Sequence, residues 1–290
     1  MSHETRARLV ADVHAVLGEG PVWVEREQAL YWVDIKGREL FRLRDSRVER
    51  WPTNVRVGSL APRTSGGFIA GTDAGFVAID PEEGQCELLF DPEEDRPTNR
   101  FNDGKVDRDG RFWAGTMDDT ERAAGGALYR LSHDLTCERI DDGFRVTNGP
   151  AFSPDGRRMY ANDSALQVTY AYDLSPDGTP SNRCEFARFG DGQGYPDGMT
   201  VDREGCLWIA FWDGWCLRRL SPEGETLAEE RMPVARPTSC AFGGPALDRL
   251  YVTSASIGLS ENERSMQPNA GALFMLDVGV RGIADRPFGG

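Results

Sequence analysis

One pattern occurs six times along the 290-residue chain, and this repetition limits the possible folds more than any other feature. Each copy contains a small or polar segment, an alternating strand pattern, a tight turn and a strand rich in aromatic or β-branched residues. Equivalent positions in that last strand lie 37 to 48 residues apart by their numbering, and a period of about 40–50 residues is typical of propeller blades. These positions are Tyr31, Phe68, Phe112, Met159, Leu207 and Leu250.

The repeats predict an all-β fold, a six-bladed β-propeller with a central channel, formed as a single domain by residues 1–290. The chain contains 33 Gly and 17 Pro, and no linker-like tract divides it. No 11-residue segment has the apolar spacing of a helix, which excludes an α/β fold. We expect a strand within residues 6–13 to close the ring by pairing with the sixth blade near residues 271–278.

The turns inside three copies carry their own signal. Asp109-Gly110, Asp155-Gly156 and Glu204-Gly205 each separate two strand-like runs. Asp-Gly is typical of the two-residue type I′ hairpin loop, in which both central residues need positive φ. We therefore predict type I′ hairpins at these positions.

The chain has 33 Lys and Arg against 47 Asp and Glu, a formal net charge of −14. This balance disfavours nucleic acid and anionic membranes as partners, and no apolar run approaches the ~18 residues that span a bilayer. The N-terminus lacks the apolar core of a secretion signal.

None of the six cysteines forms a C-x-x-C pair, so we expect reduced thiols in a cytoplasmic protein. We expect a monomer or a weak oligomer.

The innermost strand of each propeller blade lines the axis, so residues at its start can be compared across the repeats. Asn148-Gly149 or Asp197-Gly198 taken alone is typical of a turn, but Glu19 is a poor turn residue. Two carboxylates and an amide at one blade position suit a divalent cation such as Ca²⁺, Mg²⁺ or Mn²⁺. The compared positions lie ten to twelve residues before the six equivalent strand positions given above. They are Glu19, Gly58, the segment 100–102, Asn148, Asp197 and Ser239.

Histidine is scarce in the chain and does not occur at these positions. The three histidines are His3, His14 and His133. A Ser-His-Asp hydrolase and a His-ligated zinc centre therefore have no support, and no phosphate-binding or zinc-protease motif occurs. Catalysis would depend on a metal ion and carboxylates.

Several segments resemble the regucalcin (senescence marker protein 30)/gluconolactonase family of sugar lactonases, from about residue 16 to residue 290. The resemblance implies a six-bladed propeller that binds one divalent metal ion: Ca²⁺, Zn²⁺, Mn²⁺, Mg²⁺ or Fe²⁺. The segments are LGEGPVW at 17–23, RFNDGKVD at 100–107, RFWAGTM at 111–117, TNGPAFSPD at 147–155, YPDGMTVDREGCLW at 195–208, TSCAFGG at 238–244, QPNAGALF at 267–274 and GVRGIA at 279–284.

The resemblance also assigns roles to single residues. It implies that Glu19, Asn148 and Asp197 hold the metal, that Asp197 is also the catalytic base, and that Arg100 and Asn102 bind the substrate. An acidic substrate contact is expected just after GTM, where Asp118, Asp119 and Glu121 compete; Glu121 is the residue that we assign.

The predicted reaction opens a sugar aldonolactone, of gluconolactone or pentonolactone type, to the sugar acid. Two alternatives remain from the sequence: a promiscuous organophosphate or phosphoester hydrolase, and a non-catalytic calcium-binding regulatory propeller. Asp163 either lies near the site or caps a turn. Trp212 and Trp215 are candidates for a wall against the sugar ring, whereas Trp23, Trp32, Trp113 and Trp208 are expected in the core.

Overall fold

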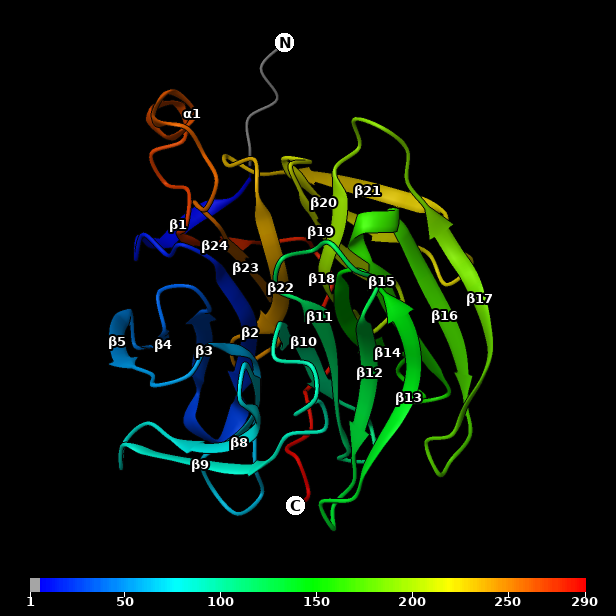
Figure 1. Cartoon of the computed structure of the whole chain (residues 1–290). Helices are drawn as coiled ribbons and strands as arrows, with labels where there is room; N and C mark the ends of the chain where they lie inside the picture. The colour runs from blue at the N-terminus through cyan, green and yellow to red at the C-terminus, as the bar shows by residue number, and fades with distance from the viewer. Residues whose placement is uncertain (1–5) are drawn as a thin grey trace.

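The computed structural model describes residues 6–290, whose strands pair into six antiparallel sheets of four (Figure 1). These sheets follow one another around a common axis, and the innermost strand of each contacts the innermost strands of both neighbours. The all-β prediction of a six-bladed propeller is confirmed. The first three blades are β2 (Gly18–Val24), β3 (Ala29–Asp34), β4 (Glu39–Arg44) and β5 (Arg47–Pro52); β6 (Val57–Pro62), β7 (Phe68–Thr72), β8 (Gly75–Asp80) and β9 (Gln85–Phe90); and β10 (Asn99–Val106), β11 (Phe112–Asp118), β12 (Gly126–Leu131) and β13 (Cys137–Phe144).

The remaining three blades follow the same plan, except that the sixth takes its outermost strand from the N-terminal end of the chain. They are β14 (Thr147–Phe152), β15 (Arg158–Asp163), β16 (Val168–Leu174) and β17 (Pro180–Arg188); β18 (Tyr195–Val201), β19 (Leu207–Trp212), β20 (Cys216–Leu220) and β21 (Thr226–Arg231); and β22 (Pro237–Gly243), β23 (Arg249–Ser254), β24 (Leu273–Leu276) and β1 (Arg8–Ala11).

Pairing of β1 with β24 closes the ring, as the sequence predicts. Arg8 lies opposite Met275, and Leu9 lies opposite Phe274, in an antiparallel register. Because the two ends of the chain share one sheet, the first and sixth blades cannot separate without breaking backbone hydrogen bonds. Within the described part of the chain, residues 6–290, helical structure is limited to two short 3₁₀ turns, Glu25–Glu27 and Ser164–Leu166, and α1 (Glu261–Met266), which a Ser260–Glu263 capping box begins.

Aromatic side chains of the second strands fill the space between blades. Trp32, Trp113 and Trp208 are at most 1% exposed. The indole nitrogens of Trp113 and Trp208 donate to the carboxylates of Asp107 and Asp202 at 2.9 and 3.0 Å, so these large rings are buried without an unsatisfied donor. Trp23 is only partly buried and stacks on Tyr251 at the sixth blade.

The predicted type I′ hairpins are wrong in type. Gly110, Gly156 and Gly205 have positive φ, but the residues that precede them do not appear among the positive-φ residues of the described chain. In the first of these turns Gly110 N donates to Asp107 O, and the carboxylate of Asp107 accepts from Asp109 N and Arg111 N. In this first turn, an acidic residue two positions before Asp109 therefore organises a longer loop with a single left-handed glycine.

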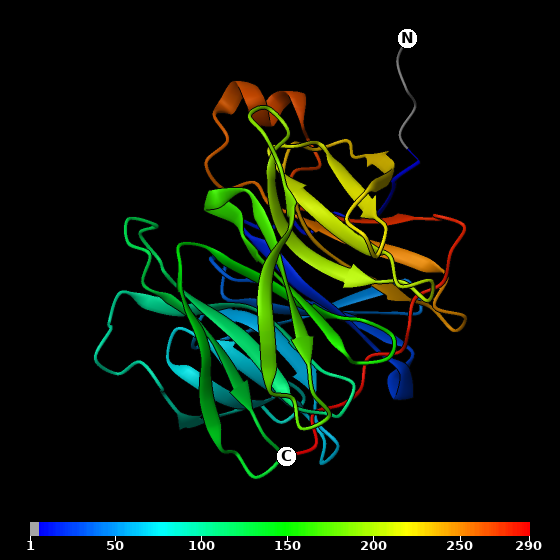
Figure 2. The ribbon, with the colours of Figure 1, turned by 90° about the vertical axis from the view of Figure 1, so that its right-hand side faces the viewer.

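The C-terminal segment crosses the end of the propeller away from the candidate site and runs between blades (Figure 2). Phe288 is fully buried; its N–H donates to Pro62 O at 2.7 Å, and its carbonyl accepts from Thr64 N at 2.9 Å. Asp285 lies 4.0 Å from Lys105 Nζ of an innermost strand. The void beside these residues measures only about 20 Å³, so the predicted central channel is almost filled at this end.

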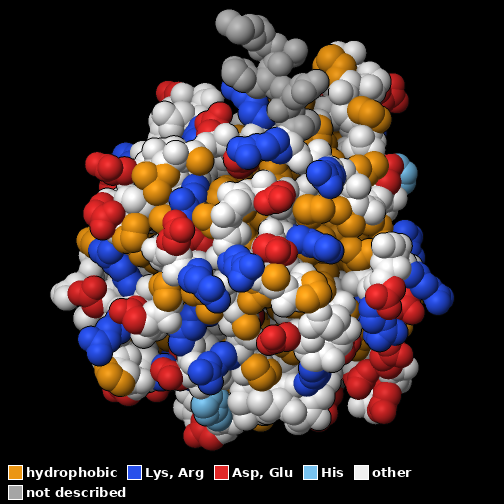
Figure 3. All heavy atoms as spheres, turned by 180° about the vertical axis from the view of Figure 1, so that it is seen from behind, with side chains coloured by type: hydrophobic (Ala, Val, Ile, Leu, Met, Phe, Trp, Pro, Cys, Tyr) orange, Lys and Arg blue, Asp and Glu red, His pale blue; other side chains and the backbone are white. Residues whose placement is uncertain are grey.

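Acidic and basic side chains are interspersed over the face seen in Figure 3. Within residues 6–290 no helix is long and apolar enough to cross a membrane. All six cysteines are free thiols, as expected, and three of them are buried: Cys206, Cys216 and Cys240.

Truncating Phe288 tests whether the C-terminal segment is part of the core. We expect Phe288→Ala to lower the free energy of unfolding by about 3–5 kcal/mol, the usual cost of removing a buried phenyl ring. The measurement is urea denaturation followed by tryptophan fluorescence. Leu88→Ala is the control, because Leu88 is 55% exposed on β9 and its loss should cost less than about 0.5 kcal/mol. Equal midpoints for both variants would contradict this role.

Candidate active site

In every blade, the pairing of the innermost strand with its neighbour shifts at the positions that the sequence predicts to face the axis. The shift follows Glu19 in β2, Asn148 in β14 and Pro196 in β18, and the other three innermost strands shift in the same region. Gly20 and Gly149 have φ of 54° and 79°, which a side chain would disfavour. A bulge redirects the adjacent side chains out of the regular alternation, here toward the axis.

Glu19, Asn148 and Asp197 line one cavity of about 600 Å³. They are 5%, 2% and 6% exposed, so water reaches their polar atoms only through this cavity. Arg100 and Asn102 of β10 and Glu121, three residues after β11, line the same cavity. The structure brings together all six residues that the sequence singles out, while their individual roles stay predictions.

Burial raises the pKa values of three acidic groups at this site. Burial and the nearby charge of Asp103 raise the pKa of Glu19 to about 8. Burial, with the charges of Glu19 and Asp103, raises the pKa of Asp197 well above its usual value. Burial raises the pKa of Asp103 to about 6. Buried carboxylates of this kind are stable in ionised form only beside a compensating cation.

Hydrogen bonds fix the amide of Asn148. Its Nδ2 donates to Ser164 Oγ at 2.8 Å, and its Oδ1 accepts from Asn102 Nδ2 at 2.9 Å. Asn102 Nδ2 also donates to Thr147 O, and Ser164 Oγ donates to Pro196 O. Because Oδ1 has a second lone pair, it remains available to a metal ion.

These side chains fit a hard divalent cation. Glu19, Asn148 and Asp197 offer two carboxylates and an amide oxygen, the ligand types that Ca²⁺ and Mg²⁺ prefer. Within residues 6–290 no three His, Cys, Asp or Glu side chains lie close enough together to hold a metal ion. The amide oxygen of Asn148 would therefore complete the ligand set of this candidate centre.

Arg100 is held at the cavity wall by three acceptors. Its Nε donates to Asp119 Oδ1 at 2.6 Å, and its Nη1 donates to Asn102 Oδ1 at 2.6 Å and to Phe101 O at 3.1 Å. Its Nη2 makes no hydrogen bond with any residue between 6 and 290, so one side of the guanidinium is free for a ligand.

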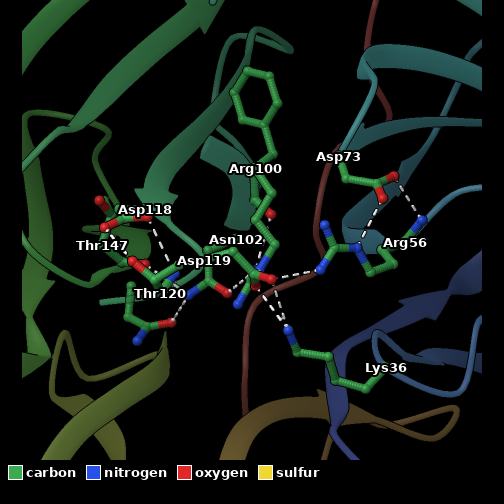
Figure 4. Close-up of polar contacts among 11 residues, drawn as sticks. Lys36, Arg56, Asp73, Arg100, Asn102, Asp118, Asp119, Thr120 and Thr147 are labelled. Carbon is green, nitrogen blue, oxygen red and sulfur yellow. Dashed lines mark hydrogen bonds and ion pairs between the residues drawn. The ribbon is translucent and has the colours of Figure 1, made fainter. Parts of the chain in front are cut away.

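The three acidic residues after GTM have separate positions. The carboxylate of Asp118 accepts from the backbone of the turn that follows and from Thr120 Oγ1. Asp119 forms ion pairs with Lys36, Arg56 and Arg100 (Figure 4). Glu121 is exposed on the cavity wall, and its charge contributes to the raised pKa of Asp197. The assigned Glu121 and the alternative Asp119 both line the cavity.

The structure also distinguishes Trp212 from Trp215 as cavity residues, and it shows which of its two expected positions Asp163 takes. Trp212 lines the cavity, whereas Trp215 does not. The carboxylate of Asp163 accepts from Arg145 N and Val146 N. Asp163 therefore supports the loop before β14, as a turn-capping residue does.

Sequence reasoning missed several residues of the cavity wall. Arg145, Tyr195 and Arg236 each lie two or three positions before a predicted axial residue, so extending the comparison of repeats backward would have found them. Lys36 follows β3, and its partner Asp119 follows β11. No sequence pattern links these two residues, which come together only in the ring.

The raised pKa of Glu19 predicts a pH-dependent stability of the metal-free protein. Between pH 4.5 and 8 the folded protein retains a proton that the unfolded chain has lost, so its stability falls as pH rises. We expect the Tm in EDTA to fall by about 5 °C or more from pH 5 to pH 8. The decrease should be smaller for Glu19→Gln or with saturating Ca²⁺. A wild-type Tm decrease no larger than that of Glu19→Gln would contradict the prediction.

The chain is similar over most of its length to several known proteins. A 6-deoxy-6-sulfogluconolactonase from Pseudomonas putida is 39% identical over 279 residues, 95% of this chain and 96% of that protein. An L-arabinolactonase from Azospirillum brasilense is 38% identical over 292 residues, 98% of this chain and 96% of that protein. Regucalcin from Agrobacterium tumefaciens, a calcium-binding protein of known structure, matches with a TM-score of 0.94 at 27% identity, covering 98% of this chain and 97% of that one. Residues 17–256 match the family described as the SMP-30/gluconolactonase/LRE-like region, and the chain belongs to this family.

Proposed function

We propose that this protein is a metal-dependent lactonase that hydrolyses a sugar aldonolactone to the sugar acid. The observation that carries the proposal is the convergence of Glu19, Asn148 and Asp197 in one cavity beside Arg100. The relatives named above include lactonases that act on sugar lactones, and the cavity of about 600 Å³ is large enough for such a ligand.

Glu19, Asn148 and Asp197 would hold the divalent ion. When bound, such an ion polarises the ester carbonyl and stabilises negative charge that develops on its oxygen. The oxygen-only ligand set favours a hard ion, Ca²⁺, Mg²⁺ or Mn²⁺, over Zn²⁺ or Fe²⁺. The description of the Agrobacterium relative as calcium-binding supports Ca²⁺.

Asp197 is the proposed general base. Its carboxylate is buried and lines the cavity, and its backbone carbonyl accepts from Asn162 Nδ2 at 2.6 Å. The strand at this point is therefore held in place, and the carboxylate can take a proton from an attacking water. A base fixed beside the ester contributes about 10²–10⁴-fold to the rate.

Arg100, Asn102 and Glu121 are the proposed substrate contacts. The free Nη2 of Arg100 donates to an oxygen atom of the substrate, and Glu121 accepts from a hydroxyl group. Asn102 contacts Arg100 and Asn148 at once, so its amide links substrate orientation to the proposed metal ligand. Such orientation of the ester relative to base and ion lowers the entropic part of the barrier.

Replacing Asp197 with Asn separates its two proposed roles. Asp197→Asn keeps an oxygen that can bind the ion but removes the base, so kcat for lactone hydrolysis should fall about 10²–10⁴-fold. The measurement is acid release followed by a pH indicator, together with ion affinity by titration calorimetry. Asp191→Asn is the control, because Asp191 is an exposed carboxylate in the preceding loop. Near-normal turnover of ion-loaded Asp197→Asn would refute the assignment.

Removal of the ion tests metal dependence. We expect EDTA treatment to abolish hydrolysis of gluconolactone and arabinolactone, and we expect re-addition of Ca²⁺, Mg²⁺ or Mn²⁺ to restore it. Activity that survives complete removal, verified by elemental analysis, would contradict the proposal. A phosphotriester in the same panel tests the hydrolase alternative, and ion binding without turnover of any ester would favour the regulatory propeller.

A further inference from the structure

Three cationic side chains from three different blades share one carboxylate at the cavity wall. Lys36 Nζ lies 2.8 and 3.0 Å from the two oxygens of Asp119. Arg56 Nη1 and Arg100 Nε each lie 2.6 Å from it. Figure 4 shows the three cationic groups directed at this single residue. Hydrogen bonds of this charge-assisted kind hold all three cations in fixed positions.

The cluster carries more positive than negative charge. Arg56 also pairs with Asp73 at 2.8 Å, so three cations face two carboxylates. Burial acts to raise the pKa of Asp119, but hydrogen bonds from Lys36, Arg100 and Arg56 hold it well below its usual value. Asp119 is therefore ionised at neutral pH, and the three cations and two carboxylates leave one positive charge uncompensated within the cluster.

Unused hydrogen-bond donors of this cluster face the cavity. Lys36 and Arg100 both line it, whereas Arg56 does not. Lys36 Nζ has three N–H groups, and Asp119 is its only acceptor among residues 6–290. Arg100 Nη2 likewise has no acceptor among the described residues. These N–H groups at the cavity wall are available to a ligand that occupies the cavity.

The cavity is balanced in charge as a whole, but it has a cationic excess outside the metal position. Its wall contains four cationic side chains and four acidic ones, in a chain of net charge −14. Two of those four acids, Glu19 and Asp197, are proposed metal ligands. Outside the metal position, the wall therefore has four cationic groups, Lys36, Arg100, Arg145 and Arg236, and two acidic groups, Asp119 and Glu121.

Hydrogen bonds place the cluster beside the metal position and outside it. Arg100 Nη1 donates to Asn102 Oδ1, and Asn102 Nδ2 donates to Asn148 Oδ1. Two side chains thus separate Asp119 from the nearest proposed metal ligand. A ligand whose ester carbonyl lies at the metal position would reach Lys36 with a substituent remote from that ester.

We propose that Lys36 and Arg100, held by Asp119, form a subsite for an anionic group on the substrate, a carboxylate, sulfonate or phosphate remote from the lactone ester. This inference rests on the proposed function, because it assumes that a lactone occupies the cavity. The subsite recognises charge through Lys36 and direction through the N–H groups of Arg100 Nη2, the one guanidinium nitrogen without an acceptor among residues 6–290. The preferred substrate class is therefore an anionic sugar lactone.

The first experiment compares kcat/KM for a neutral six-carbon aldonolactone with lactones that carry a terminal carboxylate, sulfonate or phosphate. We expect the metal-loaded protein to prefer at least one anionic lactone by about tenfold or more, roughly the effect of one charge-assisted hydrogen bond. The preference should weaken as salt increases, since screening reduces attraction at a partly exposed site. Comparison of the three anionic lactones shows which group fits.

Lys36→Met removes the charge with little change in length, and it should reduce the preference to about threefold or less. Arg188→Met is the matched control, because it removes one cation that pairs with Glu185 on the outermost strand β17. It should leave the preference unchanged. Urea denaturation of both variants checks that they are folded.

Binding gives a second readout that does not depend on turnover. We expect a sugar dicarboxylate to bind the wild type more tightly than the corresponding monocarboxylate by about tenfold, measured by calorimetry, and Lys36→Met to abolish the difference. Equal kcat/KM for neutral and anionic lactones, or a preference that Lys36→Met retains, would overturn the inference. Failure to hydrolyse any lactone would contradict the proposed function instead, and the binding difference would then decide the subsite.

Discussion

The packing of six innermost strands around one axis is the constraint on which the rest of this structure depends. Each of these strands contacts both neighbours, and β1 completes the sixth blade, so the ring has no free end. A bulge at the same position in each strand then directs side chains of several blades to one place. Residues as distant in sequence as Glu19 and Asp197 share a cavity because each stands at the same place in an innermost strand, next to the axis of the ring.

That convergence concentrates charged side chains in one cavity, and the acidic groups on its two sides have different surroundings. Glu19 and Asp197 are buried with raised pKa values and little cationic compensation, an arrangement that a divalent ion would stabilise. Asp119, one side of the cavity away, is surrounded by three cations and has a lowered pKa. One cavity thus contains a region that needs a cation and a region with spare cationic donors, which matches a ligand with an electrophilic ester and an anionic end.

The sequence predicted best those features of the structure that recur in every blade. Six copies of one pattern predicted the blades, and the shared register predicted that Glu19, Asn148 and Asp197 meet. The turns were less predictable. Asp109-Gly110 suggested a type I′ loop, but the carboxylate of Asp107, two residues earlier, organises a longer turn. Local dipeptide preference was overridden by a side-chain hydrogen bond that the dipeptide does not encode.

By itself, the sequence determined the number of blades, the closing strand and the residues at the start of each innermost strand, because all of these follow from periodicity. Only the tertiary structure decided which residues surround them. Lys36, Arg56 and Asp119 lie in different blades and at unequal positions in their repeats, so no spacing relates them. Their contact depends on how neighbouring blades are rotated about the axis, which is a property of side-chain packing between sheets.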